Sequence, residues 1–337
     1  MDAVTRVLAS GYIAQGPEVE RLQQEWAVAT ATAGAVCVGS GLAALRLALH
    51  AAGVRPGGEV IVPAYSCVAL FNAVLALGAT PVLADVEADR WTLDPVSAAE
   101  HRNPRTAAIV AVHLFGMPAD LRRLGELGLP IIEDCAHGIG GCVEGRPFGG
   151  GTVASVASFY ATKLIAGGAG GVVASNDDAL LRVVRQARDP SDQPPNALHL
   201  NDKLTDLEAA IARVQLARLR WILQQRAVRA KRYAEMLSDL SADDVIALPE
   251  AAEGRVWYRY AVRLRRGSAA DIARTLQSTG VHTEQPVWDV RGTLDWGSEL
   301  RESDAAFDRL LSLPLYPDLT PLEQDRVCDA VRETLAS

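Results

Sequence analysis

The chain has 337 residues, of which 49% are hydrophobic and 22% charged, and its formal net charge is −8. This length and composition predict a globular protein with one large and one small domain. The sequence lacks the basic clusters that bind nucleic acid, and it has no apolar run near the roughly 18 residues of a membrane span. It also lacks the layout of a signal peptide. We therefore expect a cytoplasmic protein that binds neither nucleic acid nor a membrane.

Between residues 34 and 175, short apolar segments alternate with helical ones. The expected strands are 60–62, 81–86, 107–113, 131–134, 154–160 and 171–174, and the expected helices are 41–52, 67–77 and 118–127. Strands that are apolar along nearly their whole length are typical of a sheet buried on both faces. The alternation therefore predicts an α/β domain with a mostly parallel sheet that helices flank.

The pattern changes after about residue 203. One or two long amphipathic helices are expected over 203–239, then a strand at 256–264 and helices at 268–279 and 320–335. We therefore predict a smaller α+β domain at the C-terminal end, with the large domain spanning 1–217 and the small one 218–337. Within the large domain, Pro190, Pro194 and Pro195 predict a surface loop over 188–199.

Small residues around Gly41 open the first of the expected helices. The run from Gly39 through Ser40 and Gly41 leaves the backbone N–H groups of a helix N-terminus accessible, and such groups bind anions. A glycine turn into a core helix explains the run equally well. The anion site stays a hypothesis at this point.

Two ionisable residues follow buried strands of the same predicted sheet. Asp134 ends an apolar strand, and Lys163 follows the strand at 154–160 and precedes a run of small residues. In an α/β sheet the carboxyl ends of the strands form the ligand site, so both side chains are expected there. A buried carboxylate that pairs with a protonated pyridine nitrogen, and a desolvated lysine amine, are what a pyridoxal phosphate enzyme needs. A helix-capping Asp134 and a solvated surface Lys163 are the alternatives for each residue taken alone.

The order of these motifs resembles the DegT/DnrJ/EryC1/StrS family of sugar aminotransferases, which are fold-type I pyridoxal phosphate enzymes. The resemblance covers nearly the whole chain. It rests on residues 11–20, 40–41, 63–67, 112–116, 133–137, 158–163, 201–207 and 313–317, of which the segment Ser158-Phe159-Tyr160-Ala161-Thr162-Lys163 is the most specific.

The resemblance implies roles for the matched positions. Lys163 would carry the cofactor as a Schiff base and move the proton, while Asp134 would pair with the pyridine nitrogen. His137 would lie near the ring hydroxyl. Phosphate contacts would come from Gly41, the backbone of Leu42 and Ala43, and the Ser158 hydroxyl. Asn201 would reach the cofactor of a neighbouring subunit, which implies a homodimer with shared active sites.

Two positions depart from the family pattern. Leu42 stands where relatives commonly have Thr, so one hydroxyl contact to the phosphate is lost. Cys67 stands where many relatives stack an aromatic ring on the cofactor. Either the Cys67 thiol or the nearby Tyr65 would pack on the ring.

The same resemblance implies the substrates. The amino donor would be glutamate or glutamine, and the acceptor a keto-sugar, carried on a nucleoside diphosphate in most relatives, or a keto-cyclitol, in secondary-metabolite or surface-glycan biosynthesis. The candidate diphosphate ligands and the residues that would line the substrate side are Arg188, Lys203, Arg259, Arg291, Tyr12 and Trp288. Each has an ordinary surface position as its alternative.

Three other functions remain open. A sugar dehydratase on the same fold is disfavoured by Lys163, because the family's 3-dehydratases carry His there. A non-catalytic regulatory homologue is the second, and the Leu42 and Cys67 departures favour it. A metal enzyme is the least favoured, because Cys135, His137 and Cys142 lack a second ligand pair.

Overall fold

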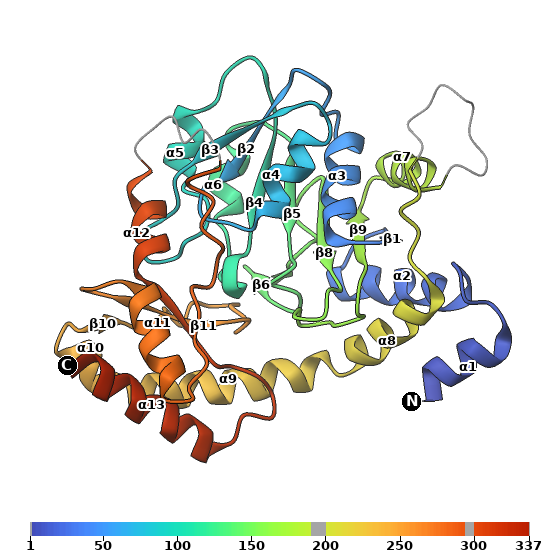
Figure 1. Ribbon diagram of the computed structural model, residues 1–337. Helices are drawn as coiled ribbons and strands as arrows, with labels where there is room; N and C mark the ends of the chain where they lie inside the picture. The colour runs from blue at the N-terminus through green and yellow to red at the C-terminus, as the bar shows by residue number, and fades with distance from the viewer. Residues whose placement is uncertain (1, 190–199, 294–299, 337) are drawn as a thin grey trace.

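The computed structural model describes residues 2–189, 200–293 and 300–336. At its centre lies a seven-stranded sheet with the order β1-β9-β8-β5-β4-β2-β3 (Figure 1). The strands are β1 (Gly34–Val38), β2 (Glu59–Pro63), β3 (Thr80–Ala84), β4 (Thr106–Val112), β5 (Ile131–Asp134), β8 (Ala154–Ser158) and β9 (Gly171–Ser175). Each neighbouring pair from β3 to β8 is parallel, whereas β9 runs antiparallel to both β8 and β1. The prediction of a mostly parallel mixed sheet is confirmed.

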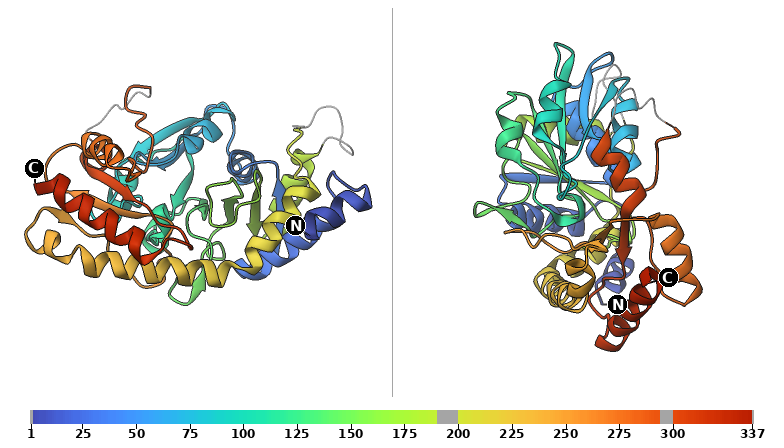
Figure 2. Two further views of the ribbon diagram at one scale, coloured as in Figure 1. Left: turned by 60° about the horizontal axis from the view of Figure 1, so that its bottom comes forward. Right: turned by 90° about the vertical axis from the view of Figure 1, so that its left-hand side faces the viewer.

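Helices cover both faces of this sheet. Figure 2 shows α3 (Gly41–Ala51) and α4 (Val68–Leu75) on one side, and α2 (Pro17–Thr30) and α6 (Leu121–Gly125) on the other. The central strands are buried along nearly their whole length, because both faces pack against helices. The helix expected at 118–127 is shorter than expected, since Asp120 caps its N-terminus by accepting a hydrogen bond from the backbone N–H of Arg123.

The register of the parallel strands brings the functional segments to one edge of the sheet. Asp134, the last residue of β5, lies opposite Val156 of β8, and Val112 of β4 lies opposite Asp134 on the other side. The chain therefore leaves β4, β5 and β8 at neighbouring points. The segments that follow these strands carry most of the residues predicted to be functional.

A second, smaller sheet lies in the C-terminal part. It is antiparallel with the order β10-β11-β12, formed by β10 (Ile246–Ala247), β11 (Tyr260–Leu264) and β12 (Leu310–Leu313). Helices α9 (Leu219–Met236), α11 (Ala269–Ser278) and α13 (Pro321–Ala336) contribute to its own hydrophobic core. In Figure 2, α8 (Asp206–Ala217) and α9 run end to end beneath both sheets. The division of the chain at residue 217 stays a proposal.

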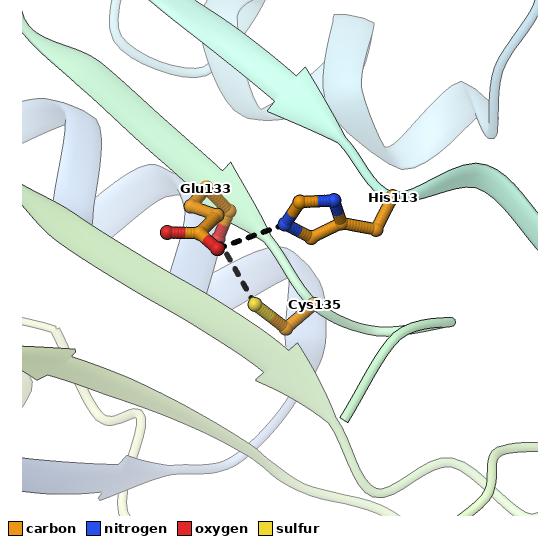
Figure 3. A group of neighbouring side chains, drawn as sticks. All are labelled: His113, Glu133 and Cys135. Carbon is orange, nitrogen blue, oxygen red and sulfur yellow. Dashed lines mark hydrogen bonds and ion pairs between the residues drawn. The ribbon is translucent and has the colours of Figure 1, made fainter. Parts of the chain in front are cut away.

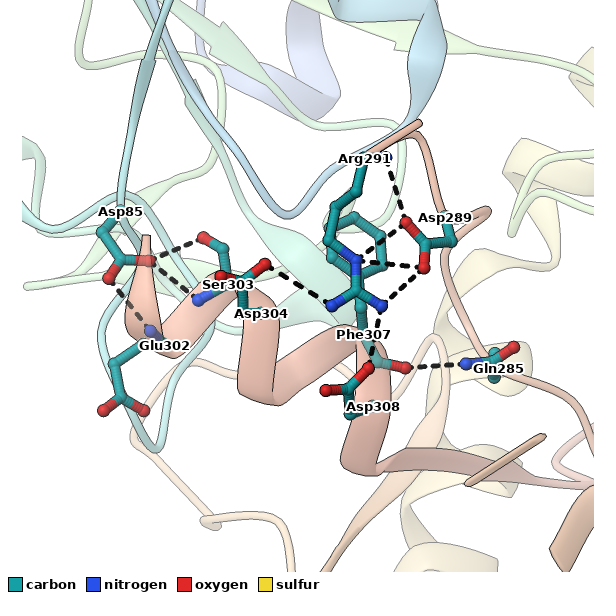
Figure 4. A network of polar contacts seen from close by, with 9 residues as sticks. All are labelled: Asp85, Gln285, Asp289, Arg291, Glu302, Ser303, Asp304, Phe307 and Asp308. Atoms are coloured by element: carbon teal, nitrogen blue, oxygen red, sulfur yellow. Dashed lines mark hydrogen bonds and ion pairs between the residues drawn. The ribbon is translucent and has the colours of Figure 1, made fainter. Parts of the chain in front are cut away.

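The C-terminal part also packs back onto the large sheet. Helix α12 (Arg301–Arg309) places Phe307 in the core of the large sheet. The carboxylate of Asp85, just after β3, accepts hydrogen bonds from the backbone N–H groups of Glu302 (3.0 Å) and Ser303 (2.8 Å), as Figure 4 shows. This long-range cap fixes the start of α12 against the large sheet.

The remaining elements are short or peripheral. They are α1 (Asp2–Ser10), α5 (Pro95–Glu100), a 3₁₀ turn (Leu114–Gly116), the β6 (Cys142–Val143) and β7 (Arg146–Pro147) hairpin, α7 (Asp178–Arg188) and α10 (Ser238–Ala242). Residues 190–199 of the loop expected over 188–199 lie outside the described residues, while Arg188 ends α7. Among the helices that the structure describes, none combines the length and apolarity needed to cross a bilayer.

Candidate active site

A pocket of about 440 Å³ opens at the carboxyl edge of the large sheet. It is lined by most of the residues that the sequence predicts to be functional: Gly41, Leu42, Cys67, Asp134, His137, Ser158 and Lys163. Three predicted cofactor residues, Ala43, Tyr65 and Asn201, do not line it. The pocket lies where an α/β sheet binds its ligands.

Asp134 supplies a buried carboxylate to this pocket. One of its oxygens accepts a hydrogen bond from the backbone N–H of Ala136 at 2.8 Å. Burial raises the pKa of Asp134 above its ordinary value, while the Ala136 hydrogen bond and the charge of Lys163 oppose this effect. A cationic partner in the pocket would stabilise the ionised form of this group.

Lys163 points its amine at His137. The distance between Nζ of Lys163 and Nε2 of His137 is 2.8 Å. A protonated amine can only donate, so Nε2 accepts and the imidazole proton lies on Nδ1. Burial, with the nearby charges of Lys163 and Arg259, holds the pKa of His137 well below its ordinary value, which keeps the ring neutral.

Tyr258 forms one wall of the same site and was not predicted from the sequence. Its ring lies parallel to the imidazole of His137, with centroids 4.0 Å apart and an interplanar angle of 12°. Nζ of Lys163 is 5.3 Å from the centroid of the Tyr258 ring. Tyr258 comes from the segment before β11, so no local pattern around the large-sheet motifs indicates it.

A buried hydrogen-bond network supports the strand end that carries Asp134. Nδ1 of His113 accepts the backbone N–H of Ala119 at 3.0 Å, so the His113 proton lies on Nε2 and is donated to Glu133 at 2.8 Å. Burial raises the pKa of Glu133, but the hydrogen bonds from His113, the backbone of Gly149 and Thr152 outweigh it and hold the pKa below its ordinary value.

Figure 3 shows His113, Glu133 and Cys135 as one compact cluster, the group that has metal-ligand geometry among the described residues. Both nitrogens of His113 already have hydrogen-bond partners, and the Cys135 thiol donates to the Glu133 carbonyl at 3.9 Å. This cluster differs from Cys135, His137 and Cys142, the candidate metal ligands that the sequence suggested. We interpret it as a hydrogen-bond network behind the pocket.

The N-terminus of α3 borders the pocket. Ser40 caps the helix, since its hydroxyl accepts the N–H of Ala43 at 3.1 Å, which leaves the N–H groups of Gly41 and Leu42 without an intrahelical partner. A Cβ at Gly41 would lie 2.7 Å from Cβ of Ser158, so only glycine allows this close approach. The cap uses the N–H of Ala43, so Gly41 and Leu42 are the better candidates for the expected phosphate contact.

The structure distinguishes the two residues proposed to pack on the cofactor ring. Tyr65 is 1% exposed and packs edge-to-face on Phe307 in the core, at 4.7 Å between ring centroids. Cys67 is exposed and lines the pocket. Ser66 between them has a buried hydroxyl without a hydrogen-bond partner, and it lines the pocket too. The structure therefore favours Cys67 over Tyr65 as the residue at the cofactor ring, and this contact stays a prediction.

Of the residues expected on the substrate side, Arg259 and Trp288 line the pocket. Trp288 is 81% exposed, and Arg259 is shared with an adjoining pocket of about 510 Å³ that also contains Arg226 and Arg326. Tyr12 is 70% exposed and lines neither pocket.

Three basic residues expected to bind a diphosphate are engaged elsewhere. Arg188 is buried and donates to the carbonyl of Cys37 at 2.9 Å, and Lys203 pairs with Asp189 at 3.3 Å. Figure 4 shows Arg291 enclosed by carboxylates, and its guanidinium nitrogens lie 2.6 Å from Asp289, 3.5 Å from Asp304 and 2.8 Å from Asp308. Neither pocket includes these three residues, which corrects the expectation.

The chemistry of the donor set fits pyridoxal phosphate. The pocket offers an amine, a buried carboxylate, and a helix N-terminus beside a serine hydroxyl. In addition, Nδ1 of His137 and Oγ of Ser66 are buried and have no hydrogen-bond partner among the described residues, so both atoms are free to bond a polar ligand. These features agree with the cofactor expected from the sequence motifs.

The comparisons with known proteins point in the same direction. A model of the DegT/DnrJ/EryC1/StrS aminotransferase family matches residues 1–332. The dTDP-3-amino-3,4,6-trideoxy-alpha-D-glucose transaminase of Streptomyces venezuelae is 37% identical over 348 residues, which cover 98% of this chain and 90% of that protein.

Solved structures share the fold, among them the following two. S. venezuelae DesV, solved in complex with a ketimine intermediate, has a TM-score of 0.91 at 35% identity and covers 100% of this chain and 94% of that chain. NtdA from Bacillus subtilis, solved with the cofactor PMP, has a TM-score of 0.90 at 28% identity, covering 100% of this chain and 81% of that chain. The predictions of a fold-type I architecture, of a pyridoxal phosphate cofactor and of aminotransferase activity are confirmed. This chain belongs to the DegT/DnrJ/EryC1/StrS aminotransferase family.

Proposed function

We propose that this aminotransferase moves the amino group of glutamate or glutamine to a keto-sugar carried on a nucleoside diphosphate. The observation that carries the proposal is the convergence of Lys163 and Asp134 on one pocket. The acceptor class is supported by the relative at 37% identity, whose name is that of a dTDP-sugar transaminase. A keto-cyclitol is the second acceptor class.

Lys163 is the proposed catalytic base. Its amine binds the cofactor and, once released, carries the proton away from Cα of the amino donor. Bound pyridoxal phosphate supplies the electron sink that makes this proton acidic. His137 accepts a hydrogen bond from the same amine, which keeps Nζ directed into the pocket.

Asp134 is the proposed partner of the pyridine nitrogen. Its carboxylate is buried at the end of β5, where a protonated ring nitrogen would offset the cost of desolvation. On the phosphate side, the N–H groups of Gly41 and Leu42 and the hydroxyl of Ser158 are the proposed donors.

The assembly is part of the proposal. Asn201 is exposed and does not line the pocket of its own chain, which supports a homodimer in which this residue reaches the partner's site. We also propose a cytoplasmic location.

Mass spectrometry of the products tests the acceptor. The enzyme in its amine form is offered a panel of nucleotide-linked keto-sugars and, separately, keto-cyclitols. The proposal predicts an amino-sugar product from the nucleotide-linked set. Amination of cyclitols alone would select the second acceptor class, and a dehydrated sugar without nitrogen gain would show dehydratase chemistry instead.

A further inference from the structure

The imidazole of His137 is held mainly by its ring contacts. Tyr258 stacks on one side at 4.0 Å, and the ring of Phe115 is nearly parallel at 6.1 Å and 14°. Nε2 bonds to Lys163, while Nδ1 is buried and has no partner among the described residues. A ring with a single polar contact can rotate about its side-chain bonds, so the stacking with Tyr258 fixes the plane of the imidazole.

Tyr258 is in turn fixed by Arg226 of α9. Nη1 of Arg226 donates to the carbonyls of Tyr258 at 2.9 Å and Leu315 at 3.0 Å. Among the described residues, Arg226 has no carboxylate partner, and burial lowers its pKa to about 10. Burying a guanidinium without a carboxylate partner costs free energy, and the hydrogen bonds of Arg226 to the two carbonyls join the segments before β11 and after β12.

A backbone contact locks the same segment onto the large sheet. The N–H of Val256 donates to the carbonyl of Gly116 at 3.1 Å. A Cβ at Gly116 would lie 2.0 Å from the carbonyl oxygen of Val256, and Gly116 has a φ of +83°, so this approach requires glycine. The path of the chain into Tyr258 is thereby fixed relative to the pocket.

We infer that Tyr258 is a positioning residue for the transamination: its ring holds the imidazole of His137 in the plane that directs Nε2 at the amine of Lys163, and Arg226 holds Tyr258 in place. The inference rests on the proposed role of Lys163. Proton transfer depends steeply on the placement of the amine, and a misplacement of about 1 Å costs on the order of 100-fold in rate.

The test is the rate constant of the first half-reaction, from the aldehyde to the amine form of the holoenzyme, measured by stopped-flow absorbance with ordinary and Cα-deuterated glutamate. Tyr258→Leu removes the flat ring and should slow this step at least about 10-fold, with a full primary isotope effect and little change in the donor concentration at half-saturation. Tyr258→Phe keeps the ring and should rescue most of the rate. A rate within twofold of wild type in Tyr258→Leu, or a slower rate without an isotope effect, would overturn the inference.

Tyr260→Leu is the matched control. Tyr260 is buried two residues further along and packs on Tyr233 at 5.1 Å, away from the pocket lining. Its loss should lower the melting temperature and leave the half-reaction rate unchanged. Should Tyr258→Leu not fold, Arg226→Gln should slow the same step with the same isotope effect, and an unchanged rate there would equally overturn the inference.

A double-mutant cycle isolates the route through His137. In a His137→Ala background, the further change Tyr258→Leu should slow the half-reaction no more than twofold, because the residue that it positions is already gone. Additive losses would mean that Tyr258 acts independently of His137. The role of Lys163 is tested separately, by borohydride reduction of the wild-type holoenzyme followed by peptide mapping, since this shows which lysine carries the cofactor. A failure of the Lys163 assignment can thus be told apart from a failure of the Tyr258 inference.

Discussion

The carboxyl of Asp134 and the amine of Lys163 line one pocket because β5 and β8 are parallel neighbours. Asp134 lies opposite Val156, so the segments that follow the two strands leave the sheet at the same edge. This geometry places a carboxyl group and an amine around one cavity, which a pyridine ring with an aldehyde group requires. The proposed function depends on this convergence of Asp134 and Lys163.

Replacing Asp134 with Asn should stabilise the cofactor-free protein at neutral pH. Burial raises the pKa of Asp134 in the folded state, so the folded protein holds a proton that the unfolded chain releases above about 3.8. Wild-type stability should therefore fall, relative to Asp134→Asn, as pH rises through the raised pKa. Urea unfolding of both apo-proteins across pH checks this result, and a variant no more stable than wild type at pH 7 would contradict it.

The same substitution should lower turnover by at least about 100-fold, the usual cost of removing one preorganised electrostatic partner. Asn retains an oxygen that can accept the N–H of Ala136, so the strand end should keep its conformation. Circular dichroism and steady-state kinetics of the holoenzyme provide the comparison.

Glu133→Gln should show the opposite pH dependence of stability. Hydrogen bonds from His113, Gly149 and Thr152 hold the pKa of Glu133 below its ordinary value, so its contribution is present above about 4.5 and is lost as pH falls through the folded-state pKa. The variant should lose about 1–3 kcal/mol of unfolding free energy at pH 7. The difference from wild type should shrink in acid. An equal difference at all pH values would contradict this assignment.

Leu42→Thr should tighten cofactor binding. Leu42 lies in the first turn of α3, lines the pocket and is 39% exposed, so a hydroxyl there can donate to a phosphate without being buried unpaired. One added hydrogen bond of about 1 kcal/mol lowers the dissociation constant roughly fivefold. Fluorescence titration of the apo-enzymes with pyridoxal phosphate checks the change, with Val28→Thr on the exposed surface of α2 as the control.

Cys67 should be the thiol that the cofactor protects. It is the exposed cysteine of the five, and it lines the pocket, whereas burial raises the pKa of Cys135 and keeps that thiol protonated. Iodoacetamide should therefore alkylate Cys67 first in the apo-protein and more slowly after pyridoxal phosphate is added. Peptide mass spectrometry identifies the site, and equal labelling with and without cofactor would contradict the proposed ring position.

Much of the large sheet was predictable, because its strands are apolar runs bounded by turns. Each of the six expected strands overlaps an observed one. Helix α2 was not among the expected elements although Val19, Leu22 and Trp26 recur at helical spacing and are buried. Its N-terminus depends on a distant residue, since the Asp206 carboxylate accepts the N–H of Gly16 at 2.8 Å and of Val19 at 3.0 Å.

Site residues that belong to local sequence motifs were predictable, whereas residues that only tertiary contacts bring to the pocket were not. Asp134 and Lys163 stand directly after buried strands, so the sheet rule places them. Tyr258 reaches the pocket from the segment before β11, and no pattern near the pocket motifs indicates it. Arg188 and Arg291 were assigned to a diphosphate because the sequence does not reveal their partners. Arg188 bonds to the Cys37 carbonyl, which is distant in sequence, and Arg291 pairs with carboxylates around α12 that no sequence motif indicates.

Lys163→Ala should lower turnover by at least about 10²–10⁴-fold, since a positioned base contributes that much. The chain has only three lysines, Lys163, Lys203 and Lys231. Lys231 is highly exposed and lies 3.8 Å from Glu235, so Lys231→Ala is the control and should retain activity.

Borohydride reduction of the holoenzyme, followed by peptide mass spectrometry, shows directly whether Lys163 carries the cofactor. Reduction fixes the cofactor to the lysine that carries it, and three lysines make the assignment unambiguous. The reduced cofactor should be found on the peptide that contains Lys163 and on no other. Its attachment to Lys203 or Lys231, or a coloured enzyme with no labelled lysine, would contradict the account.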